Sequence, residues 1–124
     1  MIDHVSIPVS RLEESAAFYE KVLEPVGLTR LVDRARTVGF GKKYPEFWLN
    51  ARPDMTPGTD DTGNHVCLRA ADNEAVKAFH AAALEQGGRN AGDPGLRKAS
   101  MSIYFGAFIF DLDGNKVEAV TFPR

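Results

Sequence analysis

Two histidines and one glutamate have the types and spacing that could hold a metal ion. His4 and His65 each stand near the start of a segment with the alternation of a β-strand, and Glu118 lies in the last such segment. Two neutral imidazoles and one carboxylate form a ligand set that divalent metals accept while positions stay open for substrate. The other interpretation is that both histidines cap strand ends by hydrogen bonding and Glu118 is a solvated charge.

An internal repeat relates the two histidines. When the chain is shifted by 61 residues, His4 falls on His65 and Gly27 falls on Gly88. Two copies of this length are too few for a solenoid, and they predict a duplicated module whose halves pack about a pseudo-twofold axis. Such an axis could bring the two histidines together. The other identical matches are Val5 on Val66, Glu13 on Glu74, Ala17-Phe18 on Ala78-Phe79 and Leu23-Glu24 on Leu84-Glu85.

Each half reads as a strand, a helix and three further strands. In the first half the helix follows residues 10–13, Ser-Arg-Leu-Glu, which have the spacing of a capping box, and it ends near Gly27. In the second half Asp72 or Asn73 can cap a helix that ends before Gly87. The predicted strands are residues 4–9, 28–33, 37–42, 46–51, 64–70, 89–91, 102–110 and 116–122.

This order of elements predicts an α+β fold in which two βαβββ modules form one domain. Module one covers residues 1–51, the linker covers residues 52–63, and module two covers residues 64–124. Residues 90–100 contain two glycines and a proline and predict a long loop at the rim of the molecule.

Strand alternation predicts which side chains share a face. The apolar side chains of each strand, such as Val66, should pack under the helices. His4, His65 and Glu118 should then point to the opposite face, which becomes a polar cleft if the sheet curves. The position equivalent to Glu118 in module one is Trp48, so a fully symmetric site with four ligands is not expected.

Composition excludes several classes of function. The 124 residues are 44% hydrophobic and 26% charged, as in ordinary globular domains, and the formal net charge of −2 disfavours a nucleic-acid partner. No apolar run reaches the length of a membrane span, and the start does not resemble a signal peptide. The single cysteine, Cys67, excludes an intramolecular disulfide, so we expect a cytoplasmic protein without membrane contact.

Four segments, spread over essentially the whole chain, are similar to a known family. They are residues 2–5 (Ile-Asp-His-Val), residues 17–19 (Ala-Phe-Tyr), residues 65–66 (His-Val) and residues 111–118 (Asp-Leu-Asp-Gly-Asn-Lys-Val-Glu). The chain resembles the vicinal oxygen chelate superfamily, which includes glyoxalase I, extradiol dioxygenases, and the fosfomycin and bleomycin resistance proteins. Members commonly have Pro in the last segment where this chain has Leu112.

The resemblance implies two βαβββ modules whose sheets form a cupped, open barrel, often in a homodimer. It implies a divalent metal ion (Zn, Ni, Mn or Fe) on His4, His65 and Glu118 that chelates adjacent oxygens of a small-molecule substrate. Glu118 would also be the catalytic group if it leaves the metal to move a proton. The fourth ligand of the glyoxalase branch falls on Trp48, so the ligand set is closer to that of the dioxygenase branch.

Four further residues are candidates for substrate binding. Trp48 could stack on a flat ligand or simply fill the core, and Arg69 could hold an anionic group or form an exposed salt bridge. Arg97 lies in the predicted rim loop, and Tyr104 belongs to an aromatic run. We expect a glyoxalase- or dioxygenase-like metal enzyme. The alternatives are a metal-free small-molecule binding protein of the bleomycin-resistance type and a structural or regulatory module whose cup is filled by side chains.

Overall fold

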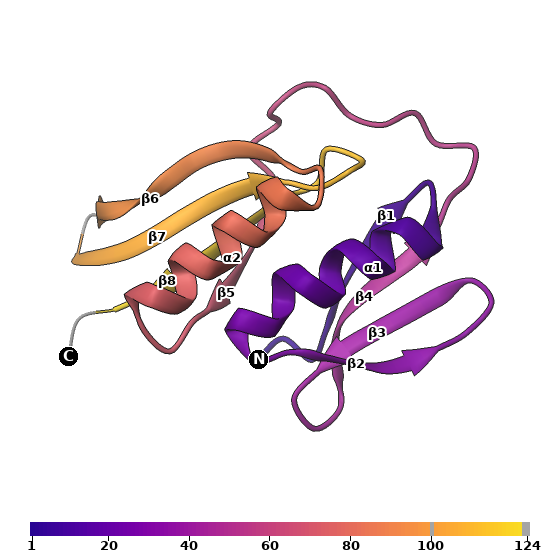
Figure 1. Ribbon diagram of the computed structural model, residues 1–124, viewed down its shortest axis with the longest axis horizontal. Helices are drawn as coiled ribbons and strands as arrows, with labels where there is room; N and C mark the ends of the chain where they lie inside the picture. The colour runs from indigo at the N-terminus through magenta and orange to yellow at the C-terminus, as the bar shows by residue number, and fades with distance from the viewer. Residues whose placement is uncertain (100, 123–124) are drawn as a thin grey trace.

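The chain folds as two βαβββ modules, as predicted (Figure 1). The computed structural model describes residues 1–99 and 101–122, so residue 100 and residues 123–124 of the range predicted for module two lie outside the described residues. Module one contains β1 (Val5–Val9), α1 (Leu12–Leu23), the 3₁₀ turn η1 (Glu24–Val26), β2 (Thr29–Asp33), β3 (Thr37–Gly41) and β4 (Pro45–Ala51). Module two contains β5 (His65–Arg69), α2 (Asn73–Glu85), β6 (Arg89–Ala99), β7 (Ser102–Phe110) and β8 (Lys116–Thr121).

The two sheets have the same topology, which confirms the duplication. The strand orders are β1-β4-β3-β2 and β5-β8-β7-β6. In each sheet the first and last strands of the module are parallel neighbours, and the other pairs are antiparallel. The two sheets remain separate and do not close into a barrel, so the fold is α+β with an open cup.

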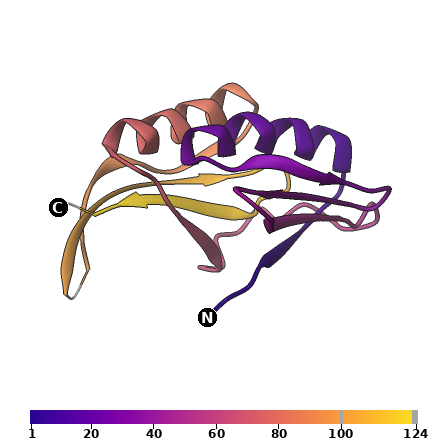
Figure 2. The ribbon, with the colours of Figure 1, turned by 90° about the horizontal axis from the view of Figure 1, so that it is seen from below.

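The helices and the sheets form two layers (Figure 2). Both helices lie side by side on one face of the sheets, and the strands curve beneath them. Tyr19 of α1 is fully buried, with its ring 5.0 Å from Phe18 and 5.1 Å from Phe47 of β4. Among the described residues, neither helix is long and apolar enough to cross a membrane.

A turn between β7 and β8 fastens module two to module one. Asp111 accepts a hydrogen bond of 2.6 Å from the Tyr19 hydroxyl, and Asp113 accepts hydrogen bonds from both the backbone N–H and the hydroxyl of Ser10. The side-chain amide of Asn115 donates to the carbonyl of Pro8. The capping box predicted at Ser10 is therefore wrong, because this hydroxyl is used between modules and α1 has no side-chain cap.

The rim loop predicted for residues 90–100 is also wrong. Residues 90–99 belong to β6, which pairs antiparallel with β7 along a hairpin, and residue 100 of the predicted loop lies outside the described residues. The register shifts between Asn90 and Gly92 and again between Gly92 and Gly95. The two glycines and the proline predicted a loop. They are compatible with β6 because it is an edge strand with bulges, where these residue types are tolerated.

Candidate functional site

His65 and Glu118 come together on the face of the second sheet that points away from the helices. The Nε2 atom of His65 lies 3.2 Å from Oε1 of Glu118, and their side chains are 37% and 6% exposed. Their strands, β5 and β8, are parallel neighbours. The adjacent residues Val66 and Val117 point the other way and pack into the core under the helices. The predicted face is thus correct for both residues.

The ring of His65 is held in one orientation by the end of the linker. Its Nδ1 atom lies 3.0 Å from the carbonyl oxygen of Gly63. A carbonyl oxygen only accepts, so Nδ1 carries the proton. In the neutral ring Nε2 then presents its lone pair toward the carboxylate of Glu118, so both groups offer electron pairs to the same point. A ligand histidine in a metal site is commonly fixed through its other nitrogen in this way.

The linker turn is itself tied to β8. Asp61 accepts hydrogen bonds of 2.9 Å from the Lys116 side chain and from the backbone N–H of Gly63. The hydrogen bond from Lys116 is the main cause that lowers the pKa of Asp61. Asp61 and Gly63 were not predicted, although the Asp-Thr-Gly sequence of residues 61–63, close before His65, is typical of a turn. Gly63 has a φ of 86°.

Glu118 also influences two side chains on its other sides. Burial raises the pKa of Cys67 to about 12, with the negative charge of Glu118 as the next cause. Burial and the same carboxylate raise the pKa of Tyr104, against the opposing effect of Arg97. Glu118 is therefore the buried centre of a polar cluster that includes His65, Cys67 and Tyr104.

His4 lies apart from this cluster. Its Nδ1 atom is 2.8 Å from the carboxylate of the adjacent Asp3, and its side chain is 52% exposed. Within residues 1–99 and 101–122, no three His, Cys, Asp or Glu side chains are grouped so that they could hold a metal ion. One chain thus brings together two of the three predicted ligands.

Trp48, Arg69 and Tyr104 line the open faces of the two sheets. The guanidinium of Arg34 lies 5.4 Å above the Trp48 ring in module one. In module two, the guanidinium of Arg69 lies 4.9 Å above the ring of Phe122, and the Tyr104 ring is 5.8 Å from that same ring. These two residues and Phe122 form an aromatic and cationic surface beside Glu118.

Arg97 is occupied within the β6–β7 hairpin. Its Nη1 atom donates to the carbonyls of Gly95 and Gly106, and its Nη2 atom donates to the carbonyl of Asp93. The guanidinium also lies 5.4 Å from the ring of Phe108. These hydrogen bonds stabilise the bulged part of β6. They would compete with the predicted contact between Arg97 and a substrate.

A cavity between the modules reaches His65. It has a volume of about 280 Å³ and lies between β1 and β5, with Ile7, Asn64 and Asn115 among its lining residues. The imidazole is therefore accessible both from the open face and from the junction of the two modules.

Comparison with known proteins agrees with the duplicated fold. The chain matches the family model of the Glyoxalase/Bleomycin resistance protein/Dioxygenase superfamily over residues 1–119. The chain belongs to this superfamily. No curated protein is significantly similar to it.

Solved structures of the same class share the fold over nearly the whole chain. A glyoxalase/bleomycin resistance protein from Albidiferax ferrireducens T118 is 29% identical, with 98% of each chain covered and a TM-score of 0.86. A glyoxalase/dioxygenase from Nostoc punctiforme is 19% identical, with 100% of this chain and 92% of that chain covered and a TM-score of 0.73. A glyoxalase/bleomycin resistance protein/dioxygenase family enzyme from Burkholderia phytofirmans PsJN is 15% identical, covers 98% of each chain and has a TM-score of 0.72.

Proposed function

We propose that this chain is a metal-dependent enzyme that acts on a small organic substrate with two adjacent oxygens. The observation that carries the proposal is the geometry of His65. With Nδ1 fixed on the Gly63 carbonyl, Nε2 and the Glu118 carboxylate converge on one point of an open face. A cytoplasmic location is part of the same proposal and rests on the single cysteine.

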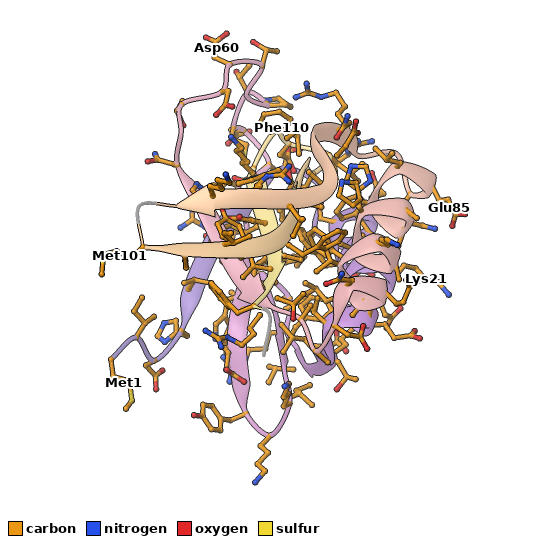
Figure 3. All side chains as sticks on the ribbon, turned by 90° about the vertical axis from the view of Figure 1, so that its left-hand side faces the viewer. Met1, Lys21, Asp60, Glu85, Met101 and Phe110 are labelled. Carbon is orange, nitrogen blue, oxygen red and sulfur yellow. The ribbon has the colours of Figure 1, made fainter. Side chains whose placement is uncertain are left out.

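A catalytic divalent site takes about three protein ligands, and one chain contributes two. We propose that His4 of a second copy is the third, in a homodimer. In support, the N-terminal segment extends away from the helices, and Met1 lies on the side opposite Lys21 and Glu85 (Figure 3). Ile2, next to the pair of Asp3 and His4, is 79% exposed, as expected of a segment that docks on a partner.

The side chains of the open face would have different roles. His65 and Glu118 would hold the metal, which when bound stabilises negative charge that develops on the substrate oxygens. Glu118 would also accept a proton from the substrate once it leaves the metal, because it is the one carboxylate of the ligand set. Arg69 and Tyr104 would orient the substrate, with Trp48 of the other copy available to stack on a flat group.

Elemental analysis of the protein purified without added metal tests the proposal. We expect a divalent metal at a stoichiometric level, and its loss in His65→Ala and Glu118→Ala. Glu46→Gln, which removes a carboxylate from β4, should keep the metal. A folded protein that takes up no metal when loaded with Zn²⁺, Ni²⁺, Mn²⁺ or Fe²⁺ would rule out a metal enzyme.

Mixing two inactive variants tests the contribution of His4 from a partner. His4→Ala and Glu118→Ala should each lose the metal alone and recover part of it when mixed and allowed to exchange subunits. In the mixed dimer one site again has every ligand. If His4 acted within its own chain, mixing would restore nothing, and if His4→Ala keeps its metal, His4 is not a ligand.

A metal-free binding protein is the second candidate, favoured by the surface of Arg69, Tyr104 and Phe122 and by the two-ligand set within one chain. A thermal-shift series with aromatic carboxylates such as benzoate, in the presence of EDTA, tests it. Binding to the folded state raises the apparent melting temperature. Stabilisation that persists in Glu118→Ala would favour the binding protein, and stabilisation only after metal loading would favour the enzyme.

A further inference from the structure

Two adjoining cavities lie at the other end of the junction between the modules. One, of about 210 Å³, lies between β4 and β5, and the other, of about 370 Å³, lies between η1 and the end of β5. Val26, Lys42 and Arg69 line both cavities, which therefore adjoin each other. We call the two cavities together the seam groove. His65, Glu118, Tyr104 and Phe108 are not among the residues that line it.

The seam groove combines an apolar floor with charged edges. The floor consists of Val26, Leu28, Phe47 and Leu68. Three of these are core residues at 9% exposure or less, and Leu68 packs against them, so the floor is a fixed part of the fold. An apolar floor of this kind binds hydrocarbon by removing it from water.

The two cations of the groove are free to bind an anion. Among the ion pairs of the described residues, none involves Lys42, Arg69 or the third charged residue of the groove, Glu46. The guanidinium of Arg69 lies over the ring of Phe122, a contact that uses none of its N–H donors. Lys42 and Arg69 line both cavities, whereas Glu46 lines only the first, so positive charge predominates where the two cavities meet.

We propose that the seam groove binds a small anionic amphiphile, a medium-chain carboxylate. The carboxylate would lie between Lys42 and Arg69, where two cations can each donate a charge-assisted hydrogen bond. The alkyl chain would lie on the floor around Leu28 and Phe47. A cationic amphiphile would be repelled by the same two residues, and a short carboxylate would lack the apolar contact.

Calorimetric titration with octanoate, below its micelle concentration and with EDTA present, tests the class of ligand. We expect one binding site per chain for octanoate, with binding at least about tenfold weaker for octanol, octylamine and acetate. Binding of octanol as tight as that of octanoate would overturn the role of the cations. Binding of acetate as tight as that of octanoate would overturn the role of the floor.

Variants locate the site. Lys42→Gln and Arg69→Gln should each weaken octanoate binding about tenfold, because each removes one charged partner. Lys43→Gln is the matched control, since this exposed neighbour of Lys42 does not line the groove. Ala71→Phe should block the second cavity and also weaken binding. If Arg69→Gln weakens binding and Lys42→Gln does not, the ligand lies on the face beside Tyr104 and the proposal is wrong.

The metal-site variants keep this test separate from the proposed enzyme. His65→Ala and Glu118→Ala should bind octanoate as the natural sequence does, because neither residue lines the groove. Loss of octanoate binding in these two variants, with the fold intact, would show that the carboxylate occupies the candidate active site instead.

Discussion

Glu118 and Trp48 occupy equivalent positions in the two modules. Because one is a carboxylate and the other an indole, the open faces of the two sheets have different chemistry. Glu118 pairs in register with Cys67 of β5, and Trp48 pairs with Ser6 of β1. The carboxylate gathers a histidine, a thiol and a phenol around itself, whereas the indole lies against Gly39 and carries Arg34 on its ring. Within one chain, the carboxylate that could take part in acid–base or metal chemistry therefore lies in module two, and module one contributes only His4 to the proposed site.

Cys67 should react slowly despite its exposure. With a pKa raised to about 12, the thiol at pH 8 contains little thiolate, the reactive form. We expect alkylation by iodoacetamide to be about 30- to 100-fold slower than that of a free cysteine. The small fraction of thiolate slows the reaction, and the higher nucleophilicity of a more basic thiolate offsets part of this effect. Glu118→Gln removes the neighbouring negative charge and should speed the reaction. Equal rates for the variant and the natural sequence would contradict the contribution of Glu118 and leave burial as the cause of the raised pKa.

Asp61 should influence the affinity of the proposed metal site without being a ligand. It links Lys116 to the turn whose carbonyl holds His65. Asp61→Asn keeps the shape and removes the charge, and we expect about tenfold weaker Zn²⁺ binding in a competition with a chelator. Asp60→Asn, an exposed neighbour in the linker, is the control and should bind as before. An equal loss in both variants would mean that the linker acts only through its net charge.

At the level of elements, the turn from Asp111 to Asn115 is the part of the sequence pattern with the clearest structural role. Burial raises the pKa of Asp111, and the hydrogen bond from Tyr19 is the strongest opposing cause. Burial and the carboxylate together raise the pKa of Tyr19 well above its ordinary value, so its hydroxyl stays protonated and donates. The pair couples α1 to the β7–β8 turn across the two modules.

The free energy of unfolding of Tyr19→Phe should depend on pH. A carboxyl whose folded pKa is raised favours folding below its unfolded pKa, and this contribution is lost as pH rises through the folded value. Without the Tyr19 hydroxyl, the charged Asp111 loses a donor, so the substitution should cost about 1.5–3 kcal/mol at pH 7 and clearly less at pH 4. Urea unfolding at both values measures this. Tyr44→Phe, at an exposed tyrosine, should show no such difference.

Sequence patterns predicted the helices and most strands because those segments bury one regular face each. Helical spacing at Tyr19 and Leu23, and alternation around Val66 and Val117, follow directly from the core they form. Only residues 89–91 of the bulged β6 were predicted as a strand, because its glycines interrupt the alternation on which a strand prediction depends. The pairing of Ser10 with Asp113 could not be predicted, since it joins residues from different modules and competes with a local cap.

The candidate site was predictable only in part, for a similar reason. Register and alternation within module two place His65 beside Glu118. The position of His4 depends on how the N-terminal segment runs before β1, where no strand partner restrains it in the sequence pattern. The orienting carbonyl of Gly63 depends on a turn in the linker.

For the molecule as a whole, the linker and the β7–β8 turn are in close contact at Gly114. This residue has a φ of 86°, and a Cβ placed there would lie 2.2 Å from the carbonyl oxygen of Gly58. Gly63 has the same φ, with nothing within 4 Å of its Cβ position. Substitutions at the two glycines therefore distinguish the free-energy cost of the left-handed backbone conformation from the cost of a steric clash.

Gly63→Ala should lower the free energy of unfolding by about 1–2 kcal/mol, the cost of the left-handed conformation alone. Gly114→Ala should lose clearly more, because the linker must move away from Asp113, to which Gly58 donates a hydrogen bond. Denaturant unfolding of both variants measures the difference. Equal losses would show that the linker yields without cost and does not help to join the modules.

The fastening of the modules is unequal along their junction. The hydrogen bonds of Ser10, Tyr19 and Asn115 between the modules, and that of Gly58 from the linker, all lie around the β7–β8 turn, beside the start of β5. The seam groove lies at the far end of the junction, beside Arg69. These hydrogen bonds therefore hold the two modules together at one end of the junction. Local opening should separate the two modules more readily beside the seam groove, which lies away from these hydrogen bonds, so backbone amides should exchange with solvent most slowly near Asp113 and fastest near Ala71.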